Sequence, residues 1–266
     1  MTLVAGVDIG STTAKSVLLE DGTIVGKSLA PVGVELVRDA ERALEKALVD
    51  AGRSRGEVGY VTGTGYGRFK VTFGQLTVTE IGCHARGAHH LFPGTRLVVD
   101  IGGQDTKAIR VGEKGEVIDF AMNDKCAAGT GRFLDVCAGA LGFDVGEIGP
   151  ISLQARHPVK VTSTCTVFAE SEVTSLVTRG KEPKDVLAGL HASIASRSYS
   201  LMQRVGISPE VTFTGGVSRN EGMVRALEKR LGLPVNVSAL SQYMGAVGAA
   251  LVGAERLAQP REASAA

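Results

Sequence analysis

Apolar residues along the chain recur with two periods, which separate expected helices from expected strands. Between residues 35 and 51 they are spaced as on one face of a helix, and Gly52 follows as a C-cap. The same pattern predicts helices at 79–91, 128–141, 167–177, 186–205, 220–231 and 243–257. Short apolar runs bounded by turn residues predict strands at 3–9, 16–19, 58–61, 116–120, 159–161, 211–214 and 235–237. Together these elements indicate an α/β fold.

One polar phrase occurs twice in this pattern, each time between two expected strands. The stretch 7–17 reads VDIGSTTAKSV and the stretch 99–109 reads VDIGGQDTKAI. The shared Asp and the shared Lys are both offset by 92 residues. An internal repeat of this kind predicts two similar lobes that face each other across a nucleotide. We expect an N-terminal lobe over 1–92 and a C-terminal lobe over 93–266.

Each copy of the phrase carries groups that suit a phosphate. Asp8 ends a strand, where a carboxylate can hold Mg²⁺, and Gly10 lets the backbone approach an anion. Donors and a positive charge follow at Ser11, Thr12, Thr13 and Lys15. The second copy offers Asp100, Gly102, Gly103, Gln104 and Asp105. A single Asp-x-Gly is often only a turn, but two copies in register favour the positioning and charge neutralisation that phosphoryl transfer needs. Asp100 would serve Mg²⁺ as Asp8 does, and Gln104 or Asp105 would orient the attacking water.

A third segment follows the expected strand at 211–214. Gly215 and Gly216 lie between this strand and a helix start, and Gly-Gly lets a flat base or ribose lie against the backbone. Alone this is a weak signal, since such a pair is commonly a turn. After the two phosphate phrases it becomes a candidate adenosine site, which includes Val217 and Asn220.

Two cysteines stand directly before expected helices. Cys126 lies in NDKCAAGTGRF at 123–133, and Cys165 begins CTVFAESE at 165–172. The positive end of a helix stabilises a thiolate, so either can be a metal ligand or simply a small, partly buried residue. One chain offers too few ligands at suitable spacing, but a two-fold dimer would complete a four-Cys site for iron–sulfur or zinc. Cys137 fits an apolar face, and Cys83 receives no chemical role.

Composition narrows the class of partner. The net charge of +1 gives no reason to expect nucleic acid or a membrane surface, and aromatic residues are too few, at 5%, for base-stacking surfaces. The longest apolar stretch is far too short for a membrane span, and the N-terminus lacks a signal-peptide pattern. We therefore expect a cytoplasmic protein with reduced thiols.

The three glycine-containing segments, in this order, resemble the superfamily of actin, heat-shock chaperones and sugar kinases. That resemblance implies duplicated ribonuclease H-like domains with a five-stranded sheet each and ATP in the interlobe cleft. Together with the two cysteine segments, the motifs resemble the activators, or archerases, of 2-hydroxyacyl-CoA dehydratases within the BadF/BadG/BcrA/BcrD ATPase family. The resemblance covers essentially the whole chain except its last few residues.

The family resemblance also implies a mechanism. It implies a homodimer in which Cys126 and Cys165 of each subunit hold one [4Fe-4S] cluster. ATP hydrolysis would drive a low-potential electron to a dehydratase, with ferredoxin or flavodoxin as donor. A benzoyl-CoA-type or other double-cluster reductase is the alternative acceptor. A small-molecule kinase would need an acceptor-binding insertion that this short chain lacks, and a nucleotide-gated scaffold would bind zinc or no metal.

Overall fold

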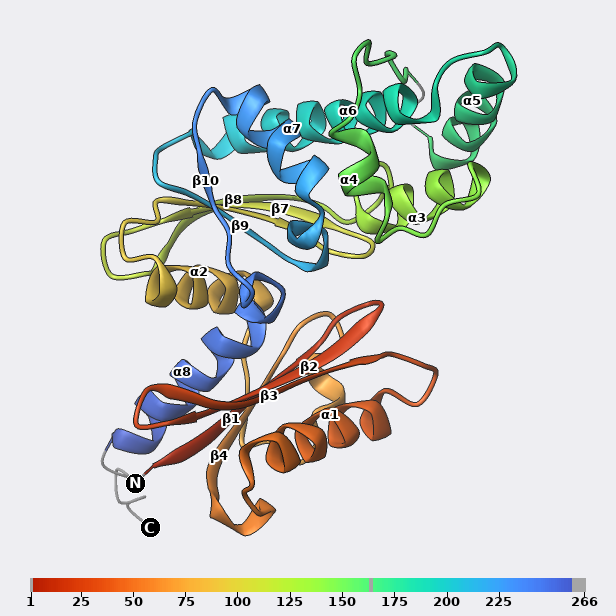
Figure 1. Ribbon diagram of the computed structural model, residues 1–266. Helices are drawn as coiled ribbons and strands as arrows, with labels where there is room; N and C mark the ends of the chain where they lie inside the picture. The colour runs from red at the N-terminus through yellow and green to blue at the C-terminus, as the bar shows by residue number, and fades with distance from the viewer. Residues whose placement is uncertain (1, 163–164, 260–266) are drawn as a thin grey trace. The chain divides into compact units, whose positions relative to one another are not determined.

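A computed structural model describes residues 2–162 and 165–259. Within these residues the chain forms two compact units, each with a five-stranded mixed sheet (Figure 1). Unit 1 holds the chain up to Leu91 together with the segment from Tyr243 onward. Unit 2 runs from Phe92 to Gln242. The expected α/β fold with two similar sheets is confirmed.

The sheet of unit 1 has the strand order β3-β2-β1-β4-β5. Its strands are β1 (Leu3–Ile9), β2 (Thr13–Glu20), β3 (Thr23–Pro31), β4 (Val58–Thr64) and β5 (Leu76–Thr77). The first three are antiparallel neighbours, whereas β4 runs parallel to β1 and β5 runs parallel to β4. Every residue of β1 is buried, as expected for a central strand covered on both faces.

Three helices complete unit 1. They are α1 (Leu36–Ala51), α2 (Glu80–Leu91) and α8 (Met244–Ala258), with the short turns η1 (Arg55–Glu57) and η2 (Arg68–Lys70). Helix α1 packs on β1, β2 and β3, while α8 packs on β1, β2 and β4 and against α2. Gly52 ends α1 in the left-handed conformation, as the sequence predicts.

The C-terminal helix belongs to unit 1, which differs from the expected division into residues 1–92 and 93–266. Its packing explains why. A Cβ added at Gly6 on β1 would overlap the carbonyl oxygen of Ala246, and one at Gly248 would overlap the carbonyl oxygen of Cys83 on α2. The small residues of α8 therefore let its backbone lie directly on β1 and α2.

Unit 2 repeats the same sheet order, β10-β9-β6-β7-β8. Its strands are β6 (Leu97–Ile101), β7 (Thr106–Val111), β8 (Val117–Asn123), β9 (Val211–Thr214) and β10 (Val235–Asn236). Its helices are α3 (Gly131–Ala140), α4 (Ile148–Ser152), α5 (Thr166–Thr178), α6 (Pro183–Val205) and α7 (Glu221–Leu231), with the short turns η3 (Gly216–Arg219) and η4 (Ser241–Tyr243) near the end. Helix α6 contacts the sheet, α4 and α7 pack on α6, and α3 packs against α5.

The expected strand at 159–161 is wrong, because this segment is irregular. Its backbone lies on the start of α6 instead of in the sheet. The Asp185 carboxylate accepts hydrogen bonds from the amides of Arg156 and His157, both at 2.9 Å, and the Val159 amide donates to the Asp185 carbonyl oxygen at 2.9 Å. The amide bonds, first that of His157, lower the pKa of Asp185 below its usual value.

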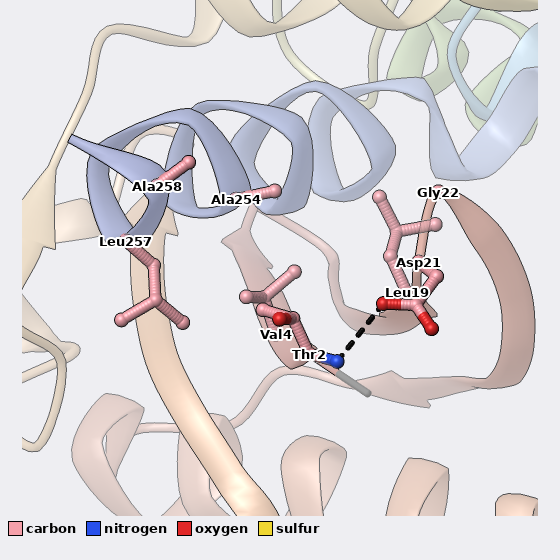
Figure 2. A pocket seen from close by; sticks show the side chains of 8 residues that line it. All are labelled: Thr2, Val4, Leu19, Asp21, Gly22, Ala254, Leu257 and Ala258. Carbon is pink, nitrogen blue, oxygen red and sulfur yellow. Dashed lines mark hydrogen bonds between the residues drawn. The ribbon is translucent and has the colours of Figure 1, made fainter.

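A small cavity of 260 Å³ opens at one end of unit 1 (Figure 2). Leu257, Ala254 and Ala258 of α8 face Val4 and Leu19 across it. The remaining lining residues are Thr2, Asp21 and Gly22. It lies at the Thr2 end of β1, roughly 20 Å of extended strand from Asp8. Its walls are mostly apolar, and it is smaller than most ligand sites.

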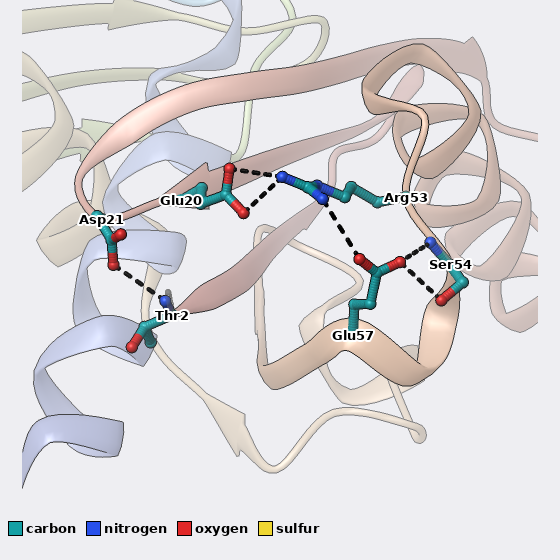
Figure 3. A network of polar contacts seen from close by, with 6 residues as sticks. All are labelled: Thr2, Glu20, Asp21, Arg53, Ser54 and Glu57. Atoms are coloured by element: carbon teal, nitrogen blue, oxygen red, sulfur yellow. Dashed lines mark hydrogen bonds and ion pairs between the residues drawn. The ribbon is translucent and has the colours of Figure 1, made fainter.

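Polar contacts tie the strand ends of unit 1 together beside this cavity (Figure 3). Arg53 binds both carboxylate oxygens of Glu20, at 2.7 and 2.8 Å, and the amide of Thr2 donates to Asp21 at 2.9 Å. Glu57 accepts from the amide and hydroxyl of Ser54 at 2.7 and 2.8 Å, which lowers the pKa of Glu57. Glu57, Ser54, Thr2 and Asp21 are exposed, and Arg53 and Glu20 are partly buried, so we expect only a modest contribution of these contacts to stability.

Candidate functional site

The first phosphate phrase forms the turn between β1 and β2. Asp8 and Lys15 lie opposite each other in the antiparallel register, which explains the constant spacing in both copies. The Lys15 ammonium donates to Asp8 Oδ2 at 3.2 Å, and the Gly10 amide donates to the Thr13 carbonyl oxygen at 3.0 Å. Lys15 is partly exposed, so its charge is available to an anion at the turn.

The second phrase forms the same turn between β6 and β7, but its lysine is enclosed. Lys107 lies opposite Asp100 and contacts Asp100 Oδ2 at 3.2 Å and Asp105 Oδ2 at 2.8 Å. The side chain of Lys107 is only 2% exposed. The Thr214 hydroxyl donates to Asp100 Oδ1 at 2.9 Å, while Gln104 is exposed at the turn. The two copies of the motif thus differ in how far the lysine is enclosed: Lys15 is 12% exposed and Lys107 is 2% exposed.

A second motif is also duplicated. It is visible in the sequence but lies outside the Asp-x-Gly phrases. Thr62-x-Thr64-Gly65 at the end of β4 matches Thr212-x-Thr214-Gly215 at the end of β9, with an offset of 150 residues. Both glycines have positive φ, +90° and +87°. A Cβ at Gly65 would overlap Asp8 Oδ1, and one at Gly215 would lie 2.7 Å from Asp100 Oδ1. Each glycine therefore leaves the space in which a turn carboxylate sits.

Asp8 also meets residues that were not predicted as site residues. A Cβ at Gly245 would lie 2.8 Å from Asp8 Oδ2 and 3.1 Å from His84 Nε2. Gly245 is in the first turn of α8, so the Asp8 carboxylate faces the positive end of that helix. His84 is buried on α2. The returning C-terminal helix thus helps to build the first turn's surroundings.

The adenosine candidates lie beside the second turn within unit 2. Gly215 contacts the Asp100 end of β6, and Gly216 begins the short helix η3. Val217 is buried. Asn220 caps α7, because its Oδ1 accepts from the Met223 amide at 2.9 Å. Its side chain therefore holds the loop in place.

Asn220 belongs to a buried hydrogen-bond chain centred on His191. The Ser152 hydroxyl donates to the Gly149 carbonyl oxygen at 2.7 Å, so His191 Nδ1 donates to Ser152 Oγ at 3.0 Å. His191 Nε2 then accepts from Asn220 Nδ2 at 3.2 Å. This arrangement fits a neutral imidazole, and burial lowers the pKa of His191 to about 4.

We expect the free energy of unfolding to fall as the pH drops from about 6.5 to about 4. The unfolded chain takes up a proton on His191 at its ordinary pKa, whereas the native state resists it down to about 4. The loss is roughly 3 kcal/mol. Urea unfolding followed by circular dichroism across this pH range, in wild type and His191→Gln, measures it. Exposed His90→Gln is the control and should keep the wild-type slope; an unchanged slope in His191→Gln contradicts the assignment.

The four cysteines divide into two classes. Cys126 and Cys165 are exposed, whereas Cys83 and Cys137 are buried and burial raises the pKa of each buried thiol to about 12. Cys165 is the N-cap residue of α5, and Cys126 lies five residues before α3. Among the described residues, no cluster of three or more His, Cys, Asp or Glu side chains can hold a metal.

The second turn is connected to the Cys126 segment by hydrogen bonds. The amides of Gly131 and Arg132, at the start of α3, donate to the carbonyl oxygens of Gly102 and Gly103 at 2.9 and 2.8 Å. The Thr106 hydroxyl donates to the carbonyl oxygen of Gly129 at 2.8 Å. The turn is therefore joined directly to the first residues of α3 and to the loop before it.

Residues 5–253 match the BadF/BadG/BcrA/BcrD ATPase family. The chain belongs to this family. It is 44% identical over 256 residues to the (R)-2-hydroxyglutaryl-CoA dehydratase activating ATPase of Acidaminococcus fermentans, covering 96% of this chain and 98% of that protein. No helix in the described part of the chain has the length and apolarity to cross a bilayer.

Solved structures of this family share the fold. The crystal structure of component A of the A. fermentans (R)-2-hydroxyglutaryl-CoA dehydratase has a TM-score of 0.94 at 42% identity, with 97% and 100% of the two chains covered. The activator of 2-hydroxyisocaproyl-CoA dehydratase from Clostridium difficile, solved with bound ADPNP, has a TM-score of 0.91 at 41% identity, with 96% of each chain covered. A ROK family glucokinase from Streptomyces griseus shares the fold, with a TM-score of 0.62 at 14% identity and 95% and 99% of the two chains covered, as the motifs' resemblance to sugar kinases implies.

Proposed function

We propose that this protein is an ATP-dependent activator that hydrolyses ATP to drive low-potential one-electron transfer to a 2-hydroxyacyl-CoA dehydratase. The observation that carries the proposal is the backbone connection between the second phosphate turn and α3, next to Cys126. Nucleotide contacts at this turn act directly on the segment that bears a candidate metal ligand. The names of two relatives, an activating ATPase and an activator solved with ADPNP, support the same activity.

ATP binding is assigned to the two turns and the Gly215 loop. Asp8 and Asp100 would hold Mg²⁺, each with a lysine beside it. Phosphate would be bound by the amides and hydroxyls at 10–13, by Lys15 and by the backbone at 102–104. Adenosine would be bound by the Gly215–Asn220 loop. Because Asp105 is already paired with Lys107, the exposed Gln104 is the better candidate to orient the attacking water.

Cys126 and Cys165 fit a shared [4Fe-4S] cluster. Thiolates are the usual ligands of such clusters, and these two thiols are exposed while the other two are buried. One chain supplies half of a four-thiolate set, so a homodimer would complete it. A cluster bound there would supply a one-electron carrier. Ferredoxin or flavodoxin is the proposed donor, and the reduced cytoplasm the proposed location.

Anaerobic purification of the wild-type protein tests the metal. We expect a brown homodimer with four iron atoms and four sulfides per two chains. Cys126→Ser and Cys165→Ser should each lose the iron yet still bind ATP by calorimetry. Cys137→Ala, a change at a buried thiol on α3, should keep the iron. Zinc, or a cluster that persists in both serine variants, would overturn the ligand assignment.

Activity is tested by adding the protein, ATP and a reductant to a 2-hydroxyisocaproyl-CoA dehydratase. We expect dehydration that depends on ATP hydrolysis and is absent when ADPNP replaces ATP. Transfer of phosphate from ATP to a small molecule, with no activation of the dehydratase, would indicate a kinase instead. A benzoyl-CoA reductase in place of the dehydratase tests the alternative acceptor.

A further inference from the structure

Arg197 on α6 extends a positive charge toward the Cys126 segment. Its guanidinium lies over the ring of Phe133 on α3, 5.1 Å from the ring centre. A Cβ at Gly129 would lie 3.6 Å from Arg197 Cδ, so the stem of the arginine packs against the loop that follows Cys126. The contact joins α6 to the segment between Cys126 and α3.

The charge of Arg197 is shielded from water. The side chain is partly buried, and its Nη1 atom is inaccessible to solvent. Burial lowers the pKa of Arg197, while the nearby Cys126 and Cys137 act to raise it. Arginine stays protonated in proteins, so a full positive charge lies at low local dielectric beside α3 and the loop that follows Cys126.

Carboxylates of α5 also act on this region. Glu170 and Glu172 of α5 act on Cys137, where they favour the protonated thiol. Arg197 and these carboxylates therefore act on the Cys137 thiol of α3 with opposite sign. A buried charge in this setting changes the energy of any added electron nearby, because reduction adds one negative charge.

We propose that Arg197 sets the reduction potential of the [4Fe-4S] cluster held by Cys126. The inference rests on the proposed function, and it assigns the arginine a role beyond packing. Its positive charge favours the reduced state and keeps the potential within reach of a biological donor. The contacts of Arg197 described above join it to Phe133 and to the loop at Gly129, so we expect it to act on the potential and not on ATP hydrolysis.

Redox titration of the anaerobic holoprotein, followed by electron paramagnetic resonance, tests this role. We expect the midpoint potential of Arg197→Gln to shift to a more negative value, and that of Arg197→Lys to stay nearer the wild type. Arg204→Gln removes the same charge from the exposed end of α6 and should leave the potential unchanged. The ATP affinity of all three variants should match the wild type.

Each outcome decides the matter. Equal potentials in wild type and Arg197→Gln would overturn the proposal, as would an equal shift in Arg204→Gln. If Arg197→Gln loses its cluster, Arg197→Lys decides: retention supports the charge, whereas loss shows that the guanidinium only packs. A wild-type protein without iron refutes the proposed function itself, while a normal cluster with an unmoved potential refutes only the role of Arg197.

Discussion

Lys107→Met should lower the free energy of unfolding by about 3–5 kcal/mol, because it leaves two carboxylates without their shared buried cation. Lys107 is 2% exposed and contacts both Asp100 and Asp105. Asp100 is itself buried, at 2% exposure. The equivalent change at Lys15 removes one partly exposed contact to Asp8 and should cost about 1.5–3 kcal/mol.

The two lysines should also differ in function. Lys15 is less enclosed than Lys107, with 12% against 2% of its side chain exposed, so Lys15→Met should weaken ATP binding strongly with a smaller loss of stability. The chain has no tryptophan, so urea unfolding is best followed by far-ultraviolet circular dichroism. Calorimetry gives the ATP affinity. Equal midpoints for the two variants would show that burial of Lys107 does not matter as argued.

This contrast could not be predicted from the sequence, although the motif itself could. The offset of 92 residues revealed the repeat, and the antiparallel register explains why Asp and Lys keep their spacing. The difference between Lys15 and Lys107 comes from Asp105 and Thr214, whose side chains close the second turn. Such enclosure depends on tertiary packing, which a repeated motif does not encode.

The strands and helices followed the hydrophobic pattern where one packing surface dominated. The pattern agrees with the strand at 211–214 and with the helix ending at Ala51. It also agrees with the helix caps at Gly52 and Gly232. Strand β3 was missed because its exposed edge breaks the alternation of apolar residues. The segment at 159–161 has an apolar strand-like sequence, but its Val159 amide donates to the Asp185 carbonyl oxygen at the start of α6.

The return of α8 to unit 1 has a different cause. Small residues give a helix no clear apolar face, so nothing local indicates which sheet it covers. The decisive feature is complementarity between Gly6 on the strand and the backbone of α8. His84 was missed for a related reason, since only packing against Gly245 separates it from the other histidines of α2.

Gly215→Ala should be far more damaging than an alanine at another left-handed glycine. Gly215 has φ +87°, and a Cβ there would overlap the Ile101 carbonyl oxygen and lie 2.7 Å from Asp100 Oδ1. Gly232 has φ +70° with open space around its missing Cβ. Gly232→Ala therefore isolates the backbone strain, about 1–2 kcal/mol, while Gly215→Ala adds an overlap worth roughly 1–3 kcal/mol more.

The overlap at Gly215 should also affect function, because one of the atoms that must move is an oxygen of Asp100, the carboxylate proposed to hold Mg²⁺. We expect Gly215→Ala to lose Mg²⁺-ATP affinity, measured by calorimetry, while Gly232→Ala keeps it. The first unit offers the same comparison: Gly65→Ala would overlap Asp8 Oδ1, whereas Gly52→Ala meets nothing. If both glycines beside a turn carboxylate tolerate alanine with unchanged affinity, the Asp-Gly pairs are turns alone. If both lose it, the motif with an offset of 150 residues is as much a part of the nucleotide site as the Asp-x-Gly phrase.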